Sequence, residues 1–599
     1  MIAPKSSSPP RPRQVVQIGV IGHRPNRLSP EIAVGLPRQC ERVLTAISQL
    51  AAEANDPLLH APGAPLLRII SPLAEGADRI VAAAGLAVGA DLQCPLPFHA
   101  GEYSRDFKTA ASKDEFNALL ARASSVFEAD GRRSAEAIAY ERVGQMVIEQ
   151  SDLLIVIWDG APAAGRGGTA QMVGEALEQA VPIVWLHASE AAEPQILQAD
   201  ENGDRSLRPL DNLPSLFAAR RPETPKQDKK AFDLSHAYFA EKHPRFNGGR
   251  PFTFFRDLVA KGKLKIGSLF IADFETTARD DWQKTMPRKP ELPRATEGYL
   301  LDKLCPHYAW ADGLSTYYGG LLRSGSLATN LLSALAVFVA LLGPLSDSLH
   351  IPKMNRKPSV VEFVLIAAIL SITYWGRHRR WHERWLNYRQ LGERLRQYCF
   401  LAPLGCSLPT PRHVAHSGSD PSQAWVDGMF HSIARDIGIA PGRVEQPYLA
   451  SIGELIGNIL QGQIVYHEGN HEKMEKLNHH LHQAGTWLFG ITLLACIYHV
   501  WVGREAAWLL VLATAPPAFG AAFYGIANQG EFARSADRSL AMRREFASLR
   551  ENDLKKALSS GNESFANLRI VAEKIAEIMI SETNDWSVVF RYRSLNLPG

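Results

Sequence analysis

The segment from Pro162 to Leu177 holds the residues best suited to binding a phosphate. It follows an apolar run that ends at Asp159, and it leads into a helical pattern. Its candidate ligand-binding residues are Asp159, Gly165, Gly167, Gly168 and Thr169. Because the first N–H groups of a helix are free, the amides of Gly167, Gly168 and Thr169 are predicted to form a phosphate cradle.

Three further loops carry side chains of similar chemistry. After the first apolar run, Gly22 permits a tight turn, and His23 and Arg24 offer donors to an anion. In the second loop Gly76 begins a helix, and Asp78 either caps that helix or accepts from a sugar hydroxyl. Glu75 and Arg79 complete this second set. In the third loop Tyr103 is a candidate for stacking on a base and Arg105 for pairing with a phosphate.

These loops have to be positioned by an alternating pattern of strands and helices between Val15 and Leu186. Short β-rich runs occur at VVQIGVIG, LLRIIS, DLQCPLP, DLLIVIWD and VPIVWL, with helical stretches such as 76–88 and 134–150 between them. The alternation predicts an α/β, Rossmann-like domain with a doubly wound parallel sheet, whose ligands bind at the carboxyl ends of the strands. Each loop alone would be explained by an ordinary turn or helix cap, whereas several at successive strand ends favour a bound nucleotide.

Composition places the chain in a reducing compartment and gives no reason to expect a nucleic-acid partner. The net charge is only +3, and the six cysteines form no CxxC pair, as is typical of unpaired thiols. Residues 1–14 are rich in Pro and Ser and contain no apolar core of a signal peptide, so we expect a disordered tail there.

Four uncharged or nearly uncharged stretches follow Tyr299, at about 325–345, 359–376, 484–503 and 506–528. A helix needs about 20 apolar residues to cross a bilayer, so these predict four membrane spans. The alternative is a set of buried core helices. The predicted organisation is a tail at 1–14, a nucleotide-binding domain at 15–190, a linker or elaboration at 191–298 and a helical membrane domain with a cytoplasmic helical stalk at 299–599.

The distribution of Lys and Arg predicts that both termini are cytoplasmic. The second and fourth spans are followed by arginine-rich segments: Arg377, Arg379, Arg380, Arg384, Arg389, Arg394 and Arg396, and then Arg534, Arg538, Arg543 and Arg544. The two loops on the other side carry only Lys353, Arg356, Lys357 and Arg504. Since positive residues favour the cytoplasmic side, two hairpins cross the membrane and return. We expect the bacterial inner membrane, with membrane lipids as partners.

One motif in the helical half suggests a different chemistry. His467, Glu468 and His471 match H-E-x-x-H, which on a helix places two imidazoles on one face for zinc with a Glu as general base. Gly469 weakens the helix, and polar residues on a solvated stalk explain the same pattern. A membrane zinc protease is therefore the weakest of the functional alternatives.

The order of the loops GHR, S-x-L-A-E-G-A-D, Y-S-R-D-F and G-R-G-G-T resembles the SLOG superfamily, which is related to the DNA-processing protein A fold and to the lonely-guy phosphoribohydrolases. The resemblance implies a Rossmann-like domain that binds nucleotides or nucleotide-derived signals, and some members hydrolyse an N-glycosidic bond. The hydrolases carry Gly-Gly-x-Gly-Thr-x-x-Glu at the last loop. Here Gly165, Gly168 and Thr169 match, but Gln171 and Met172 stand where the Glu is expected.

A neutral amide cannot act as a carboxylate base, so this departure favours binding over cleavage. Glu175 lies about one helical turn further on and is the candidate replacement. The helical half, with ERWLNYRQLGERLR and the YH-x-x-N element at Tyr466, His467 and Asn470, resembles the SLATT family of membrane domains associated with SLOG proteins in bacterial conflict systems.

The two resemblances together imply a membrane effector. Its SLOG domain would sense a nucleotide-derived second messenger, with no other cofactor and no catalytic residue. Binding would trigger membrane perforation by a homo-oligomer, in antiphage defence by abortive infection. The competing hypothesis is a membrane-tethered nucleotide N-glycosidase that uses Glu175 or another carboxylate.

Overall fold

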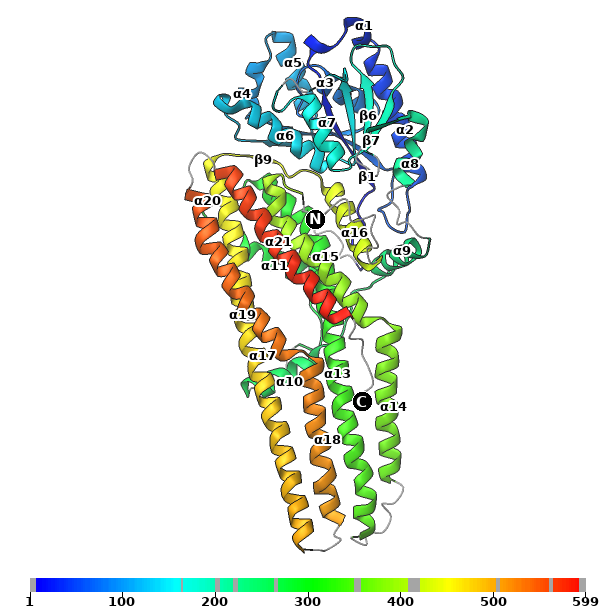
Figure 1. Cartoon of the computed structure of the whole chain (residues 1–599), viewed down its shortest axis with the longest axis vertical. Coiled ribbons are helices and arrows are strands. Elements are labelled where there is room, and N and C mark those ends of the chain that lie inside the picture. The colour runs from blue at the N-terminus through cyan, green and yellow to red at the C-terminus, as the bar shows by residue number, and fades with distance from the viewer. Residues whose placement is uncertain are drawn as a thin grey trace.

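The computed structural model describes residues 7–162, 165–199, 205–218, 225–262, 268–348, 357–407, 421–502, 507–559 and 564–591. A sheet with its helices forms one end of an elongated molecule, and long helices extend from it to the other end (Figure 1). Residues 7–14 belong to the predicted disordered tail, but they pack against the sheet part: Arg11 donates to the Leu58 carbonyl over 3.0 Å. The disorder prediction is therefore wrong for them, because backbone carbonyls bind the arginines of this segment.

Five strands match the five predicted apolar runs: β1 (Val15–Gly22), β2 (Leu66–Ile70), β3 (Asp91–Leu96), β5 (Leu153–Trp158) and β6 (Ile183–His187). Four more strands complete the sheet: β4 (Ser125–Glu128), β7 (Gln195–Ala199), β8 (Arg205–Pro209) and β9 (Gly442–Arg443). Among the described residues the strand order is β8-β7-β6-β5-β1-β2-β3-β4-β9.

The sequence predicted a wholly parallel sheet, but the sheet is mixed. Neighbouring strands in the series β6-β5-β1-β2-β3-β4-β9 are parallel. Strand β7 pairs antiparallel with both β6 and β8. The sheet also continues past residue 190 into the segment predicted as a linker. Strand β8 has the sequence RSLRP and is mostly exposed, so it lacks the apolar pattern by which a strand is predicted.

Helices cover both faces of the sheet. On one face a core cluster joins the strands to helices α2, α3 and α5, and on the other face α6 and α7 pack on the strands. The bounds are α1 (Pro30–Ala33), α2 (Leu36–Glu53), α3 (Ala77–Ala87), α4 (Ala100–Tyr103), α5 (Ala110–Leu120), α6 (Glu136–Gln150) and α7 (Thr169–Glu178). This arrangement matches the predicted helices at 76–88, 134–150 and from Thr169.

Long helices make up the remainder of the described chain. The segment before them contains α8 (Leu213–Ala218), α9 (Pro225–Phe239), α10 (Arg250–Lys261), α11 (Phe274–Thr285) and α12 (Arg294–Gly298). The helices that follow are α13 (Cys305–Ser348), α14 (Lys357–His378), α15 (Trp381–Leu401), α16 (Pro421–Ile437), α17 (Gln446–Val502), α18 (Ala507–Gln529), α19 (Phe532–Ser548), α20 (Lys555–Ser559) and α21 (Ser564–Arg591).

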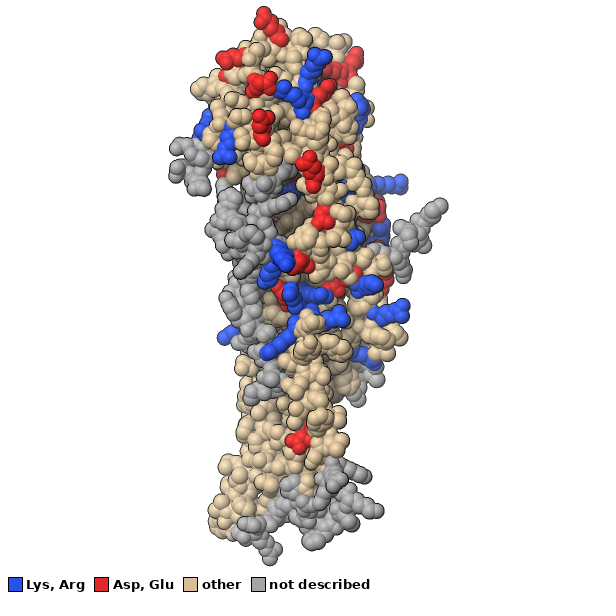
Figure 2. Space-filling model, turned by 90° about the vertical axis from the view of Figure 1, so that its right-hand side faces the viewer, with Lys and Arg blue, Asp and Glu red and all other residues tan. Residues whose placement is uncertain are grey.

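Four of these helices are long and apolar enough to cross a membrane. The candidate spans lie in α13, α14, α17 and α18. These helices contain the four predicted stretches except for residues 503 and 506, which lie outside the described residues. Figure 2 shows that the lower part of the molecule, formed by these helices, carries almost no charged side chains. Large apolar residues are exposed there, among them Phe363, Leu493 and Trp501. Exposed apolar surface of this extent is typical of a lipid-facing surface.

The sheet and the helical part share a common core, and the helical part contributes one edge strand to the sheet. Residues 442–443 leave the helices and pair with β4 as the edge strand β9. Just before this strand, Arg435 forms an ion pair with buried Asp152, and Arg68 donates to the Asp436 carbonyl over 3.1 Å. These contacts lie at the amino ends of the strands, so the carboxyl ends point away from the candidate spans (Figure 1).

Candidate functional site

The loops after β1 and β5 lie side by side at the topological switch point of the sheet. Strand β1 lies between β2 and β5. After β1 the chain continues to β2 on one side, and after β5 it continues to β6 on the other side. The amide of His23 donates to the Ile157 carbonyl over 3.0 Å, which ties the first loop to the end of β5. Open α/β sheets bind ligands at this position. The structure thus brings the first and last predicted loops together.

His23 links the two loops through both nitrogens of its ring. Its Nε2 lies 2.8 Å from Asp159 Oδ1, and its Nδ1 lies 3.2 Å from Thr169 Oγ1. The His23 side chain is only 4% exposed. Because His23 is held between a carboxylate and a hydroxyl, its role is to fix the glycine loop relative to β1.

Asp159 is the anionic centre of this edge. It also pairs with Arg27 over 2.5 Å and accepts from the amide of Ala161 over 3.0 Å. Burial opposes its ionisation, but the hydrogen bonds from His23, Ala161 and Arg27 prevail and lower its pKa to about 2. Asp159 is therefore a carboxylate at every physiological pH.

The glycine loop is organised by Gln171, which together with Met172 stands where the Glu is expected. Gly167 has a left-handed backbone with φ of 76°, and its amide donates to Gln171 Oε1 over 2.8 Å. The Gln171 Nε2 group donates in turn to Glu141 over 2.7 Å and to Glu175 over 2.8 Å. The Gly167 amide, which the sequence predicts to hold a phosphate, is thus bound to a side chain of the protein.

Glu141 was not predicted from the sequence. It lies on α6, accepts from Gln171 and forms an ion pair with Arg166 over 2.5 Å. A carboxylate on another helix, 30 residues before Gln171 in the sequence, gives no local signal there. Glu141 and Glu175 therefore flank the position at which the hydrolase motif would place its single acid.

The second loop contacts the first by close backbone packing. Gly76 has φ of 94°, and a Cβ added there would lie 2.6 Å from the His23 carbonyl oxygen. The amide of Ala77 donates to the same carbonyl over 3.1 Å. At Gly22 a Cβ would lie 2.4 Å from that of Ala77. Only glycines at both positions allow β1 and α3 to approach this closely.

Asp78 turns into the protein rather than toward the loop surface. It is buried and accepts from the amide of Ala74 over 3.2 Å. Burial raises its pKa to about 7, although the Ala74 amide and the charges of Arg24 and Arg79 act in the opposite direction. The N-cap position of α3 is Gly76, and no side chain caps this helix end. Of the two roles predicted for Asp78, capping is therefore wrong.

Arg79 and Glu75 stabilise the second loop through contacts within the protein. Arg79 is 3% exposed and donates to the Leu73 carbonyl, to Ser112 and to Glu115. Glu75 accepts a hydrogen bond from the Ser112 hydroxyl. Both predicted binding residues thus connect this loop to α5, and polar atoms of both bond to the protein itself.

The third loop contributes a surface arginine but no free aromatic ring. Tyr103 is 1% exposed and packs against Phe98, Phe107 and Phe116. Its ring has no open face for a base, so the predicted stacking role is wrong for this conformation. Packing against these three phenylalanine rings holds the Tyr103 ring in the core. Arg105 is exposed and pairs with Glu102 over 2.7 Å.

Arg24 is one of the exposed cations of this edge. It is 47% exposed, lies 3.5 Å from Asp106 and stands over the ring of Tyr140 at 5.5 Å. Arg27 and Arg166 are also exposed, on either side of Asp159 and the glycine loop. Arginines beside carboxylates suit a ligand that combines phosphates with hydroxyl groups, as a nucleotide does.

The H-E-x-x-H motif does not assemble a metal site in the described conformation. His467 is buried beside Phe546, with Glu582 at 3.9 Å, whereas Glu468 pairs with Arg543 over 3.2 Å. His471 bonds to the Ala536 carbonyl over 2.9 Å. Across the residues that the structure describes, no group of three or more potential metal ligands occurs. Each motif residue instead packs against α19 or α21.

Comparison with known proteins adds no family assignment at this point. No family model matches the chain, and no curated protein matches it. The functional argument therefore rests on the geometry of the site.

Proposed function

We propose that the protein senses a nucleotide-derived signal at the carboxyl edge of its sheet and responds through its membrane helices. The observation that carries this proposal is the contact of His23 with both Asp159 and Thr169, which unites two loops at the switch point. The loop order that resembles SLOG proteins supports the same function, and the exposed arginines Arg24, Arg27 and Arg166 supply positive charge for phosphates.

Helix α6 provides a route from this site to the helical part. Near its beginning Glu141 bonds to Gln171 of the glycine loop, and near its end Glu149 pairs with Arg569 of α21 over 2.7 Å. A ligand that displaces Gln171 would change the contacts of α6 at one end only. Such a ligand shifts the helical part only if it binds one arrangement of α6 more tightly than another.

The output that fits this architecture is perforation of the bacterial inner membrane in antiphage defence, as the SLATT resemblance implies. A pore with four spans per chain would need several chains, so the proposal includes a homo-oligomer. The charge distribution favours a cytoplasmic sheet and cytoplasmic termini. This response needs no chemical step at the sheet.

The proposal is tested by measuring ligand binding to the full-length protein in detergent. ADP-ribose and cyclic di-adenylate serve as probes in calorimetry with the wild type and with Gly168→Trp. A Cβ at Gly168 would already lie 3.3 Å from the Gly165 carbonyl oxygen, so the indole should block the loop. We expect at least tenfold weaker binding for this variant.

The matched control is Gly428→Trp, at an exposed glycine of α16 where a Cβ would meet no atom within 4 Å. It should bind as the wild type does. In cells, a signal that collapses the membrane potential should act on the control and not on Gly168→Trp. Equal binding by both variants would place the ligand elsewhere and contradict the proposal.

An N-glycosidase remains the second candidate because two carboxylates flank the glycine loop. Glu141 and Glu175 both accept from Gln171, and glycoside hydrolysis uses such a pair. Release of free base from a nucleotide, abolished in Glu175→Gln or Glu141→Gln, would favour the enzyme. Tight binding of an unchanged ligand would favour the sensor.

A further inference from the structure

A cavity of about 530 Å³ lies between the helices at the sheet-side ends of the candidate spans. Its wall is formed by residues of α10, α13, α15, α17, α18, α19 and α21. The volume falls in the range of small-molecule binding sites. The cavity is separate from the loops at the carboxyl edge of the sheet, since none of its lining residues belongs to them, and a ligand in it is independent of the proposed nucleotide site.

Positive side chains dominate this cavity. Its lining includes the cations Arg256, Arg323, Arg389, Lys473 and Arg538 and the single carboxylate Glu582. Three of the cations have partners of their own. Arg256 pairs with Asp257 over 2.9 Å, Arg389 lies 3.9 Å from Glu393, and Arg538 donates to the Glu582 carbonyl.

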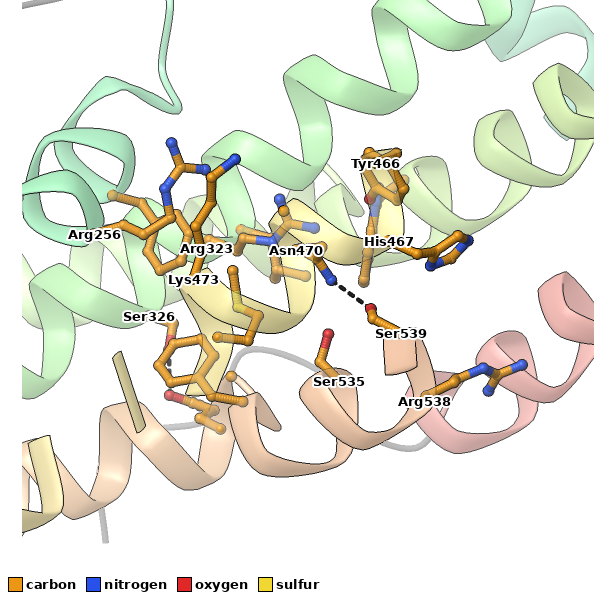
Figure 3. A pocket seen from close by; sticks show the side chains of 18 of the residues that line it. Arg256, Arg323, Ser326, Tyr466, His467, Asn470, Lys473, Ser535, Arg538 and Ser539 are labelled. Atoms are coloured by element: carbon orange, nitrogen blue, oxygen red, sulfur yellow. Dashed lines mark hydrogen bonds between the residues drawn. The ribbon is translucent and has the colours of Figure 1, made fainter. Parts of the chain in front are cut away.

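Arg323 and Lys473 differ from the other three cations. Within the part of the chain that the structure describes, neither forms an ion pair with a carboxylate. Arg323 lies instead 5.5 Å from the ring of Trp385 and 5.9 Å from that of Phe252. Figure 3 shows Arg256, Arg323 and Lys473 gathered at one side of the pocket. Since Arg323 and Lys473 have no carboxylate partner of their own among the described residues, repulsion between neighbouring cations costs stability unless a ligand supplies negative charge.

Another part of the wall is apolar and includes residues of the candidate spans. Leu327 of α13 and Ile526 of α18 line the cavity together with Phe252, Met474 and Phe532. These residues also form one core cluster. The cavity thus has a charged side next to an apolar side, where the uncharged lower part of the molecule begins (Figure 2). Ser326, Asn470 and Ser535 add hydroxyl and amide groups to the lining.

We infer that this cavity binds a phosphate group through Arg323 and Lys473, and that anionic phospholipid is its source. The positive side matches a headgroup phosphate, and the apolar side matches the beginning of an acyl chain. Basic pockets between membrane helices bind anionic headgroups in this way, and each Lys or Arg near the surface strengthens the attraction. A soluble phosphate compound offers the same charge without the acyl chain.

The test uses the full-length protein in a neutral detergent without nucleotide. Thermal unfolding is followed as phosphatidylglycerol or phosphatidylcholine is added, and native mass spectrometry counts bound lipid. Phosphatidylglycerol should raise Tm and remain bound, while phosphatidylcholine should do neither. In Arg323→Gln/Lys473→Gln we expect affinity for phosphatidylglycerol to fall about tenfold or more.

The matched control is Arg534→Gln/Lys476→Gln, which removes two exposed charges from α19 and α17 outside the cavity lining. It should retain the lipid preference. The charge-preserving variant Arg323→Lys/Lys473→Arg should retain it as well, which separates loss of charge from loss of folding. Without lipid, the double glutamine variant should melt at the wild-type temperature or above, because it removes repelling charges.

Two results would overturn the inference. One is equal stabilisation by the two lipids, and the other is an unchanged preference in the double glutamine variant. Pyrophosphate provides the second arm. If it stabilises the wild type but not the glutamine variant, while phosphatidylglycerol has no effect, the lipid source is overturned and the site takes a free phosphate compound.

Discussion

At the scale of residues, the most informative side chain is Gln171. Its amide accepts from the Gly167 N–H and donates to two carboxylates, Glu141 and Glu175. A glutamate at this position could not donate to either of them, and three carboxylates would repel one another. The surroundings of the loop therefore suit an amide donor at position 171, one of the two positions at which the acid of the motif is expected.

The sequence predicted the loops of the site better than the role of each residue. Strand ends meet at one edge of a sheet. This rule was sufficient to predict that Gly22, His23, Asp159 and Thr169 belong to one site, because they lie at or after the ends of strands. Burial could not be predicted in the same way. Tyr103 is polar enough for a surface, yet three phenylalanines that lie near it only in the fold enclose it.

The residue-scale prediction concerns Asp159. The variant Asp159→Asn should lower the free energy of unfolding at pH 7 by about 1–2 kcal/mol, because it weakens charge-assisted hydrogen bonds with His23 and Arg27. The folded pKa is about 2, below the ordinary value of 3.8. The stabilisation is therefore fully present above about pH 4 and is lost as the pH falls toward 2.

Thermal unfolding of the two proteins between pH 3 and pH 7 checks this. The difference in Tm should shrink as the pH falls. As a control, Asp281→Asn removes a carboxylate whose ion pair with Lys284 is largely exposed, and its effect should stay below about 0.5 kcal/mol. A Tm difference for Asp159→Asn that is the same at all pH values would contradict the assigned electrostatics.

At the scale of elements, hydropathy predicted the buried strands and the spans because each consists of a continuous apolar run. Strands β1 and β5 are almost wholly buried, and the four candidate spans coincide with the four predicted stretches. Strand β9 could not be predicted, because it has two residues and pairs with a strand more than three hundred positions earlier. Such a contact depends on the docking of the helices and not on local pattern.

The element-scale prediction concerns the contact between α6 and α21. A double-mutant cycle with Glu149→Gln and Arg569→Gln should give a coupling energy of about 1–2 kcal/mol, because Arg569 is largely buried and both carboxylate oxygens accept from it. Chemical unfolding of the full-length protein in detergent measures the four free energies of unfolding.

The exposed pair Lys574–Asp553, at 3.0 Å, is the matched control within the helical part. Its coupling should not exceed about 0.5 kcal/mol. If the two cycles gave the same coupling, the contact at the end of α6 would be an ordinary surface ion pair. The route from the glycine loop to α21 would then lose its support.

At the scale of the whole molecule, the charges and the fold give one consistent arrangement. The arginine-rich segments after α14 and α18 lie on the same side of the candidate spans as the sheet (Figure 1). Positive residues favour the cytoplasmic side of a membrane. The proposed orientation would therefore place the sheet, its loops and the basic cavity where soluble nucleotides and the inner leaflet are accessible.

This arrangement predicts the labelling of single cysteines in intact bacterial cells. Five native cysteines are buried, and Cys496 lies in a candidate span, so replacing Cys496 by Ser gives a suitable background. Ser359→Cys, at an exposed position near the beginning of α14, should react with a membrane-impermeant maleimide added to spheroplasts. Glu190→Cys, on the exposed surface of the sheet part, should react only after the membrane is permeabilised, because the reagent cannot otherwise reach the cytoplasm. The reverse pattern would place the sheet outside the cell, where it could not sense a cytoplasmic nucleotide, and equal labelling of both cysteines in permeabilised cells is the control for reactivity.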